Sequence, residues 1–406
     1  MNTGAYEWQR WVRPAACLVI LLITAVFGGA PSRLPALLLG GTGTNDDADN
    51  VIESFEVERD GDCLLLPVTI GGEVFDFIVD TGCSFCCVDT TLSEYLSPTA
   101  LEGRLNGRLD VRFYSIRDAV VGEARLPIPG PVMSLDLSGL RRVMGHEISG
   151  ILGMSFLRSF VIDVDFDRGR LHLLKSAAGI SGVVVPLVID EFGCPTVDVQ
   201  VDSRPAAPFL VDTGYVGSAG IQVEAGCFDE LLECSRRKTA GPGLLSMTLE
   251  GVARHREARI EAVTLRRFNH RDLLAVDGPH NAVGLDYLSR FHVTFDFRNA
   301  QACLHCGARF DDPSQIDLSG LLLERVDGET TVHAVRDGGA AARAGMVPGD
   351  CILSIDGVPA TELSMLAVRR AFSADDRILH LTVRRGRRHH AIEFQLPAQF
   401  DANVID

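Results

Sequence analysis

Residues 77–85 read FIVDTGCSF, and residues 209–217 read FLVDTGYVG. In both stretches an apolar run typical of a buried strand ends in Asp-Thr-Gly, so a carboxylate stands on a tight turn at the strand end. The two acids are Asp80 and Asp212. Either a structural element that happens to carry an acid is repeated, or two carboxylates are brought together for chemistry.

The similarity extends beyond the acidic turn. Each aspartate is followed, at nearly the same distance, by a glycine that opens a matching run: GMSFLRSFVIDVDF begins at Gly153, and GLDYLSRFHVTFDF begins at Gly284. Internal similarity at a fixed offset indicates a repeated structural unit. We therefore predict two homologous β lobes, lobe 1 at residues 52–176 and lobe 2 at residues 181–306.

The pattern of apolar runs and turn residues along the chain predicts the fold class. Both lobes consist of short runs rich in Val, Ile, Leu and Phe, punctuated by Gly, Pro and Asp, which indicates strands and hairpins. Beyond a linker at 307–317, residues 318–398 mix short strands with helical segments near 340–344 and 363–372. We predict a mainly β fold: two β-barrel-like lobes related by a pseudo-dyad, followed by a small α+β domain.

Composition limits the partners of the chain. With 406 residues, 46% of them hydrophobic and 23% charged, the chain can bury real cores and has room for two to four domains. A formal net charge of −16 argues against nucleic acid and against anionic membrane surfaces as partners, because both require a basic face.

The N-terminus predicts export. Arg10 and Arg13 precede the uncharged run AACLVILLITAVFGGA at 15–30, so we predict that residues 1–30 are a signal peptide, with an uncleaved membrane anchor as the alternative. Residues 31–51 would be a linker. The catalytic lobes would then lie outside the cytoplasm, in a periplasmic, extracellular or membrane-anchored protein. An oxidising compartment would allow some of the 11 cysteines to pair, in a connectivity that spacing does not reveal.

The residues around the two acids suit acid–base catalysis. Four residues flank the acids: Thr81, Gly82, Thr213 and Gly214. The glycines allow close backbone approach and offer N–H groups to a carboxylate, and the threonine hydroxyls can tie the turns together. If the lobes face each other, Asp80 and Asp212 lie side by side and share one proton, since both cannot ionise. One acid then activates a water while the other protonates a carbonyl oxygen, which hydrolyses a peptide bond without a metal or a covalent intermediate.

Each lobe resembles a lobe of the retropepsin-like or pepsin-like aspartic proteases, in which an apolar-apolar-Asp-Thr-Gly turn is followed by a distal apolar-apolar-Gly. The distal elements here are Ile151-Leu152-Gly153 and Ala282-Val283-Gly284. The resemblance implies that Asp80 and Asp212 form a catalytic dyad sharing a proton, supported by the flanking residues and by both distal glycines, with no cofactor. Cys83 and Tyr215 stand where the family often has Ser, Thr or Ala, which implies a different acidity for the pair.

Other motifs are weaker. A hairpin expected at 111–126 is a candidate for covering the cleft, with Tyr114 as the flap residue. The sequence HEISG at 146–150 has Gly where a zincin helix requires a second His. Cys303 and Cys306 have the spacing of half a zinc site, but no second matching pair exists. We predict no metal site.

The C-terminal region resembles a bacterial PDZ domain, on the strength of SGLLLER at 319–325 and AGMVPGDCILSIDG at 344–357. In that family a Gly-apolar loop presents N–H groups to a peptide carboxylate while an edge strand pairs with the peptide. The residues that would form this loop are Gly320, Leu321 and Leu322. The pocket beside the loop would be lined from the helix by Met365 or Val368.

Two functions fit these features. The first is an exported, single-chain and monomeric aspartic endopeptidase whose PDZ domain recruits or gates peptide or protein substrates. The alternative is a catalytically silent peptide-binding or scaffold protein that acts through its PDZ domain. Pairing of lobes between chains is unnecessary, because one chain carries two intact lobes. A silent site has no chemical reason to keep both acids, both Thr-Gly turns and both distal glycines, so the sequence favours the protease.

Overall fold

The computed structural model of the chain describes residues 50–59, 62–105, 109–216, 219–234, 244–248, 251–314, 317–373 and 377–396. The export segment predicted at 1–30 and nearly all of the linker predicted at 31–51 lie outside these residues. Among the residues described, no helix has both the length and the apolar composition needed to cross a bilayer.

Lobe 1 is built mainly from short strands, with two short α-helices and one 3-10 helix. Its elements are β1 (Val51–Glu56), β2 (Leu65–Ile70), β3 (Glu73–Val79), β4 (Cys87–Asp89), η1 (Thr90–Tyr95), β5 (Leu96–Leu105), β6 (Leu109–Ile116), β7 (Val120–Val121), β8 (Leu126–Pro127), β9 (Val132–Leu135), α2 (Ser138–Met144), β10 (Ile148–Leu152), α3 (Met154–Leu157), β11 (Val161–Asp165) and β12 (Arg170–Leu174). Alternating burial along β2 shows why its LLPVTI sequence forms a strand: every second side chain enters the core.

Lobe 2 follows a similar plan. Its elements are β13 (Val183–Pro186), β14 (Val188–Ile189), β15 (Pro195–Val201), β16 (Ala207–Val211), β17 (Ile221–Glu224), α4 (Ala225–Cys234), β18 (Leu244–Thr248), β19 (Gly251–His255), β20 (Glu257–Leu265), β21 (Phe268–Gly278), β22 (Ala282–Val283), α5 (Leu285–Leu288), β23 (Phe291–Asp296), η2 (Phe297–Asn299) and β24 (Gln301–Cys306). The four-residue helices α3 and α5 begin directly after Gly153 and Gly284, whose backbones are both extended. The sequence repeat therefore corresponds to a repeat of elements.

Each lobe has a sheet of its own. In lobe 1 nine strands follow the order β5-β6-β9-β4-β10-β3-β2-β7-β8. In lobe 2 seven strands follow the order β14-β15-β16-β22-β17-β21-β20, and β15 also pairs with β20, which closes a barrel. The strands β18 and β19 form a separate two-stranded hairpin. The prediction of a mainly β fold is confirmed.

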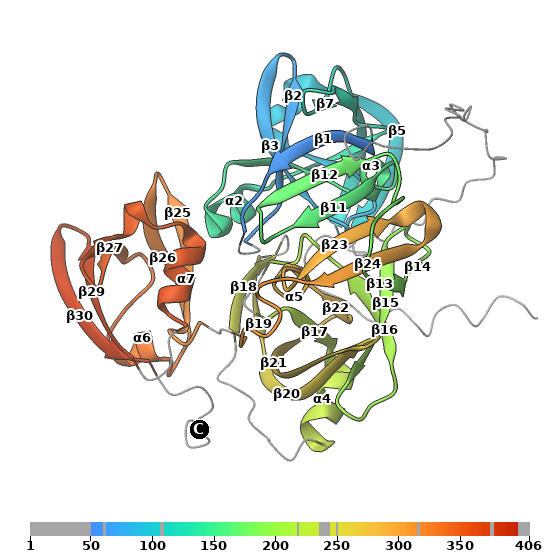
Figure 1. Ribbon diagram of the computed structural model, residues 1–406. Helices are drawn as coiled ribbons and strands as arrows, with labels where there is room; N and C mark the ends of the chain where they lie inside the picture. The colour runs from blue at the N-terminus through green and yellow to red at the C-terminus, as the bar shows by residue number, and fades with distance from the viewer. Residues whose placement is uncertain are drawn as a thin grey trace, which may run out of the picture.

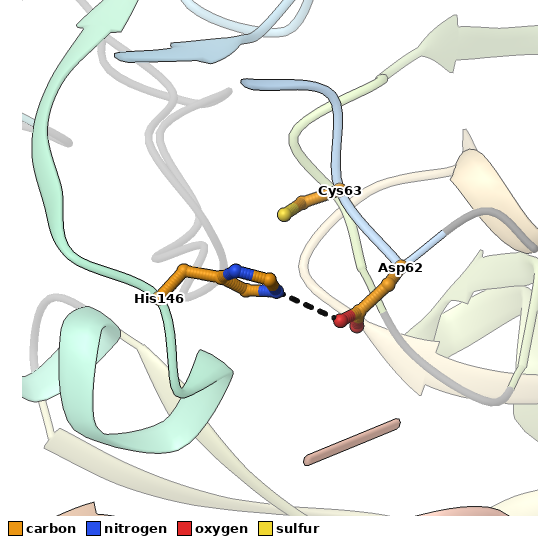
Figure 2. A group of neighbouring side chains, drawn as sticks. All are labelled: Asp62, Cys63 and His146. Carbon is orange, nitrogen blue, oxygen red and sulfur yellow. Dashed lines mark hydrogen bonds and ion pairs between the residues drawn. The ribbon is translucent and has the colours of Figure 1, made fainter. Parts of the chain in front are cut away.

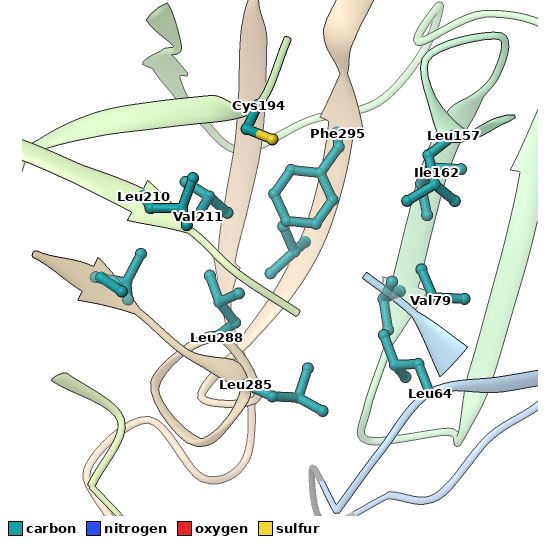
Figure 3. Close-up of a cluster of buried hydrophobic side chains, with 14 of the residues drawn as sticks. Leu64, Val79, Leu157, Ile162, Cys194, Leu210, Val211, Leu285, Leu288 and Phe295 are labelled. Atoms are coloured by element: carbon teal, nitrogen blue, oxygen red, sulfur yellow. The ribbon is translucent and has the colours of Figure 1, made fainter. Parts of the chain in front are cut away.

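A third sheet joins the lobes. Its six strands, in the order β1-β12-β11-β23-β24-β13, come from both lobes, and β11 of lobe 1 pairs antiparallel with β23 of lobe 2 (Figure 1). One continuous apolar core packs against it: Figure 3 shows Leu64 and Val79 of lobe 1 near Leu285 and Leu288 of lobe 2. The lobes thus share a backbone ladder and a core.

The C-terminal domain is a small α+β unit, as predicted. Its elements are β25 (Leu321–Val326), β26 (Glu329–Val335), α6 (Ala340–Arg343), β27 (Cys351–Ile355), β28 (Val358–Pro359), η3 (Ala360–Glu362), α7 (Met365–Ala371), β29 (Ile378–Arg385) and β30 (Arg388–Gln395). The sheet runs β25-β26-β27-β29-β30, with β28 paired to β27, so β25 is an edge strand. Its core includes Leu274 and Val276 of lobe 2, so the domain packs directly on that lobe.

Two expectations need correction. The hairpin expected at 111–126 does not form: β6 pairs with β5 and β9, whereas β7 pairs with β2 and β8. The long antiparallel partner of β6 is β5. No disulfide forms among the nine cysteines whose side chains the structure describes, which are Cys63, Cys83, Cys86, Cys87, Cys194, Cys227, Cys303, Cys306 and Cys351.

Candidate active site

The two Asp-Thr-Gly turns are positioned in the same way. In lobe 1 the turn follows β3, which runs parallel to β10, and the Asp80 N–H donates to the carbonyl of Leu152 at 3.0 Å. In lobe 2 it follows β16, which runs parallel to β22, and the Asp212 N–H donates to the carbonyl of Val283 at 3.0 Å. Each acid therefore stands at the end of a buried strand whose direction the distal element fixes.

The threonines connect the two turns. The N–H of Thr81 donates to Oγ1 of Thr213 at 3.1 Å, and the N–H of Thr213 donates to Oγ1 of Thr81 at 3.1 Å. Each hydroxyl then donates across to the other lobe, from Thr81 to the carbonyl of Val211 at 2.6 Å and from Thr213 to the carbonyl of Val79 at 2.8 Å. Four buried hydrogen bonds hold the turns against each other.

This arrangement brings Asp80 and Asp212 together. The N–H of Gly82 donates to Oδ1 of Asp80 at 2.8 Å, and the N–H of Gly214 donates to Oδ1 of Asp212 at 2.9 Å. Each glycine also lies under the opposite carboxylate: a Cβ on Gly82 would lie 2.6 Å from Cγ of Asp212, and one on Gly214 would lie 2.7 Å from Oδ1 of Asp80. Only glycine leaves room for the facing acid.

Burial makes both acids hold protons tightly. The side chains are each only 3% exposed. Burial, and then the charge of Asp212, raise the pKa of Asp80 well above its ordinary value. Burial also raises the pKa of Asp212 to about 6, against the N–H groups of Tyr215 and Gly214, which lower it. The two carboxyls together retain a proton over a wider pH range than free aspartates do.

The distal glycines support the turns by close approach. A Cβ on Gly153 would lie 2.6 Å from the carbonyl oxygen of Cys83, and one on Gly284 would lie 2.8 Å from that of Tyr215. Those carbonyls accept hydrogen bonds from the N–H groups of Met154 at 2.7 Å and Leu285 at 3.0 Å. The start of each short helix is therefore clamped to the loop that follows its aspartate.

Cys83 and Tyr215 follow the two turns directly. The thiol of Cys83 donates to the carbonyl of Phe85 at 2.9 Å and lies 3.8 Å from the thiol of Cys87. Tyr215 serves Asp212 through its backbone N–H, at 2.9 Å. Backbone N–H groups thus donate hydrogen bonds to the acids, and the Cys83 thiol bonds within its own loop.

The expected peptide loop of the C-terminal domain lies at the start of the edge strand β25. Gly320 has a positive φ of 74°, its carbonyl accepts from the N–H of Arg336 at 2.7 Å, and Leu321 donates to Oγ of Ser319 at 3.0 Å. Leu321 and Leu322 line a cavity of about 110 Å³. From α7 the cavity is lined by Arg369, whereas Met365 and Val368 are buried in the domain core.

One cluster of potential metal ligands was not predicted from the sequence. Asp62, Cys63 and His146 place their potential ligand atoms within 4.8 Å of one another (Figure 2). The ring of His146 bonds the Asp62 carboxylate at 3.0 Å, and the Arg369 guanidinium lies 3.6 Å from its other oxygen, so a hydrogen bond and a cation already compensate this charge. Asp62 and His146 are 84 residues apart, and no motif links them.

Comparison with protein families agrees with this geometry. Residues 66–156 match the family model of aspartyl proteases, a span that holds the first Asp-Thr-Gly turn and Gly153. Residues 331–385 match the model of the PDZ domain. No curated protein matches the chain as a whole. The chain therefore combines an aspartyl protease domain with a C-terminal PDZ domain.

Proposed function

We propose that the chain is an aspartic endopeptidase in which Asp80 and Asp212 form one dyad across two lobes related by an approximate twofold axis. The observation that carries the proposal is the reciprocal exchange of hydrogen bonds between Thr81 and Thr213, which seats each carboxylate over the glycine of the other turn. The protease match covers only the first turn, so this contact supplies the argument for the second acid.

The shifted pKa values suggest the role of each acid. Asp80, with the pKa raised well above the ordinary value, holds the shared proton, and Asp212 is the carboxylate that ionises first. Asp212 would accept a proton from a water as its oxygen attacks the peptide carbonyl carbon, while Asp80 gives its proton to the carbonyl oxygen. The C–N bond of the gem-diol intermediate then breaks, and the leaving amine takes the proton that Asp212 received from the water. One hydroxyl of the gem-diol returns its proton to Asp80 as the new carboxyl group forms, so the dyad again holds one shared proton.

Substitution of each acid tests the dyad. We expect Asp80→Asn and Asp212→Asn, in the chain from residue 51 onward, each to lower kcat by at least about 10³-fold, because the pair acts as one unit. The measurement is cleavage of a diverse peptide library from about pH 3 to 8. The acid limb of the wild-type profile should lie above the ordinary carboxyl pKa of 3.8, since burial raises the pKa of both acids.

Matched controls are available on the strands that precede the turns. Asp76 on β3 and Asp198 on β15 are exposed acids. The variants Asp76→Asn and Asp198→Asn should therefore cleave the peptides with the kcat of the wild type. If the folded wild-type chain cuts no peptide at any pH, the dyad is silent, and the alternative of a peptide-binding protein that acts through its PDZ domain takes over.

We further propose that the chain is exported, on the basis of the basic and apolar run at residues 10–30. The full chain should then be recovered outside the cytoplasm, and deletion of residues 1–30 should retain it inside. Fractionation with a cytoplasmic marker protein measures this. Recovery of the full chain with the marker contradicts export.

A further inference from the structure

The groove through which a PDZ domain takes a peptide lies between its edge strand and its helix, here β25 and α7. In this chain that groove faces lobe 1. The helix α2 of lobe 1 packs against both β25 and α7, and the two domains meet there (Figure 1). The edge of β25 that a peptide would join therefore lies against an element of the same molecule.

Two polar contacts and one close approach of the backbone hold α2 in place. The Arg142 side chain on α2 pairs with Glu324 on β25 at 3.1 Å. The Arg369 guanidinium on α7 donates to the carbonyl of Val143 in the last turn of α2 at 2.6 Å. Directly after the helix, a Cβ on Gly145 would lie 3.3 Å from Cβ of Met365 on α7. The contacts reach both sides of the groove.

The contact at Arg369 points to the ligand. A carbonyl at the C-terminal end of a helix carries partial negative charge, as a peptide carboxylate carries full charge. The Val143 carbonyl of α2 therefore offers Arg369 a negatively charged oxygen, as the terminal carboxylate of a peptide would. Arg369 also lies 3.6 Å from Asp62 of lobe 1. Burial raises the pKa of Asp317 in the linker, and the charge of Arg369 is among the influences that oppose this rise. None of these three partners belongs to the PDZ domain.

The same region holds the cavity of about 110 Å³. Its wall is mostly apolar and includes Val143 and Met144 of α2, Leu322 of β25, and Tyr215 and Val216, which follow the second Asp-Thr-Gly turn. An apolar cavity of roughly 150 Å³ holds a benzene ring, so this one has room for a single apolar side chain. Movement of α2 would open the cavity toward the loop of Asp212.

We propose that α2 is an internal plug of the PDZ groove, and that a peptide with a free terminal carboxylate and an apolar last side chain displaces it. The carboxylate takes the place of the Val143 carbonyl at Arg369, and the last side chain enters the cavity. This inference rests on the proposed protease function only where it concerns activation: displacement of α2 exposes the wall formed by Tyr215 and Val216 and admits substrate to the dyad.

Weakening the plug from the lobe 1 side tests the idea without changing the PDZ domain. Arg142→Glu places like charges opposite each other at Glu324. Because a closed state reduces apparent affinity by its population, the variant should bind about three- to ten-fold more tightly than the wild type. The probes are fluorescein-labelled decapeptides ending in Leu, Val or Phe with a free carboxylate, and the same peptides as amides, measured by fluorescence anisotropy.

The control is Arg170→Glu, because Arg170 makes an Arg–Glu contact of the same length with Glu56, and its side chain is 44% exposed against 42% for Arg142. It should bind the peptides as the wild type does. Equal affinity of the wild type and Arg142→Glu, or equal binding of amides and acids, overturns the proposal. So does a failure of both proteins to bind any of the peptides.

A second variant closes the plug covalently. The pair Gly145→Cys and Met365→Cys in a Cys306→Ser background starts from a Cβ separation of 3.3 Å. Disulfides usually have a Cβ separation of about 3.5–4.5 Å, so a shift of a few tenths of an ångström allows the bond to form. Oxidation should abolish peptide binding and reduction should restore it, and binding that persists after complete oxidation overturns the plug. Peptide cleavage is measured in parallel. If peptide binding changes with oxidation but no peptide is cleaved, the protease function is refuted and the plug is not. If peptide binding does not change with oxidation, the plug is refuted even if the chain cleaves peptides.

Discussion

Burial of two carboxyls side by side opposes folding at neutral pH. The folded chain raises the pKa of Asp80 well above 3.8 and that of Asp212 to about 6, so it binds protons more strongly there than the unfolded chain does. For such groups the stability is complete below the unfolded pKa and is lost as the pH rises through the folded values. The site therefore loses stability upward from about pH 4.

Asp80→Asn should remove part of this loss, because Asn resembles the protonated acid at every pH. Relative to the wild type, the variant should gain stability from pH 4 to pH 7, on the order of 1 kcal/mol or more and a few degrees in Tm. Calorimetry of both proteins across this range measures the difference. The exposed Asp76→Asn should show no such trend, and a difference that is constant with pH would contradict the prediction.

At the scale of elements, two loops from different lobes depend on each other. Each threonine hydroxyl accepts from the facing loop and donates to the strand that leads into that loop. A change in one loop therefore alters the positions of both carboxylates. The distance between the carboxylates is set by this contact together with the Cys194 thiol of lobe 2, which donates to the carbonyl of Gly82 at 3.5 Å.

Thr213→Val keeps the shape of the side chain and removes its hydrogen bonds. The N–H of Thr81 and the carbonyl of Val79 would lose their buried partners, at a cost of about 1–3 kcal/mol each. We expect a lower Tm and a drop in kcat of about 10²-fold from misplaced acids. The control is Thr196→Val, whose hydroxyl bonds the carbonyl of Val188 in an exposed setting. Wild-type kcat in Thr213→Val would show that the threonine contact does not position the dyad.

Some elements were predictable and others were not, for physical reasons. The acidic turns and the distal glycines follow from local chemistry: an apolar strand, an acid and a glycine where another backbone passes close. The helix α2 has only seven residues, too few for a periodic apolar pattern, and its role depends on a partner 182 residues away. The hairpin of β5 and β6 was missed because strand runs in lobe 1 could pair in several ways, and tertiary packing selects one.

At the scale of the whole molecule, the PDZ domain shares a core with lobe 2. Buried residues of lobe 2, Ala219, Leu274 and Val276, belong to the same apolar cluster as Leu321 and Phe372. The sequence places residues 318–398 behind a linker and is consistent with their packing on the lobes, but it does not indicate which residues meet. A single sequence contains no signal for which exposed faces of two folded units meet.

Leu274→Ala should destabilise both units together. Removal of a buried Leu costs about 2–5 kcal/mol, and here the cavity opens in the shared core. Amide hydrogen exchange should therefore quicken in β25 as well as in β21. Leu265→Ala, buried in the core of the lobes, is the control and should spare β25. Unchanged exchange of β25 in Leu274→Ala would show that the two units are stable independently.

The sheet that joins the lobes has a consequence for the covalent chain. Residues 177–180 connect the lobes, but β11 pairs with β23, and the core under both strands is continuous. If this connection were cut, the two pieces would still be held by the ladder and the core that they share. The covalent connection therefore matters less for holding the lobes together than for their ratio, because it ensures that every copy of lobe 1 is made with one copy of lobe 2. In such a fused molecule the surroundings of Asp80 and Asp212 can evolve separately.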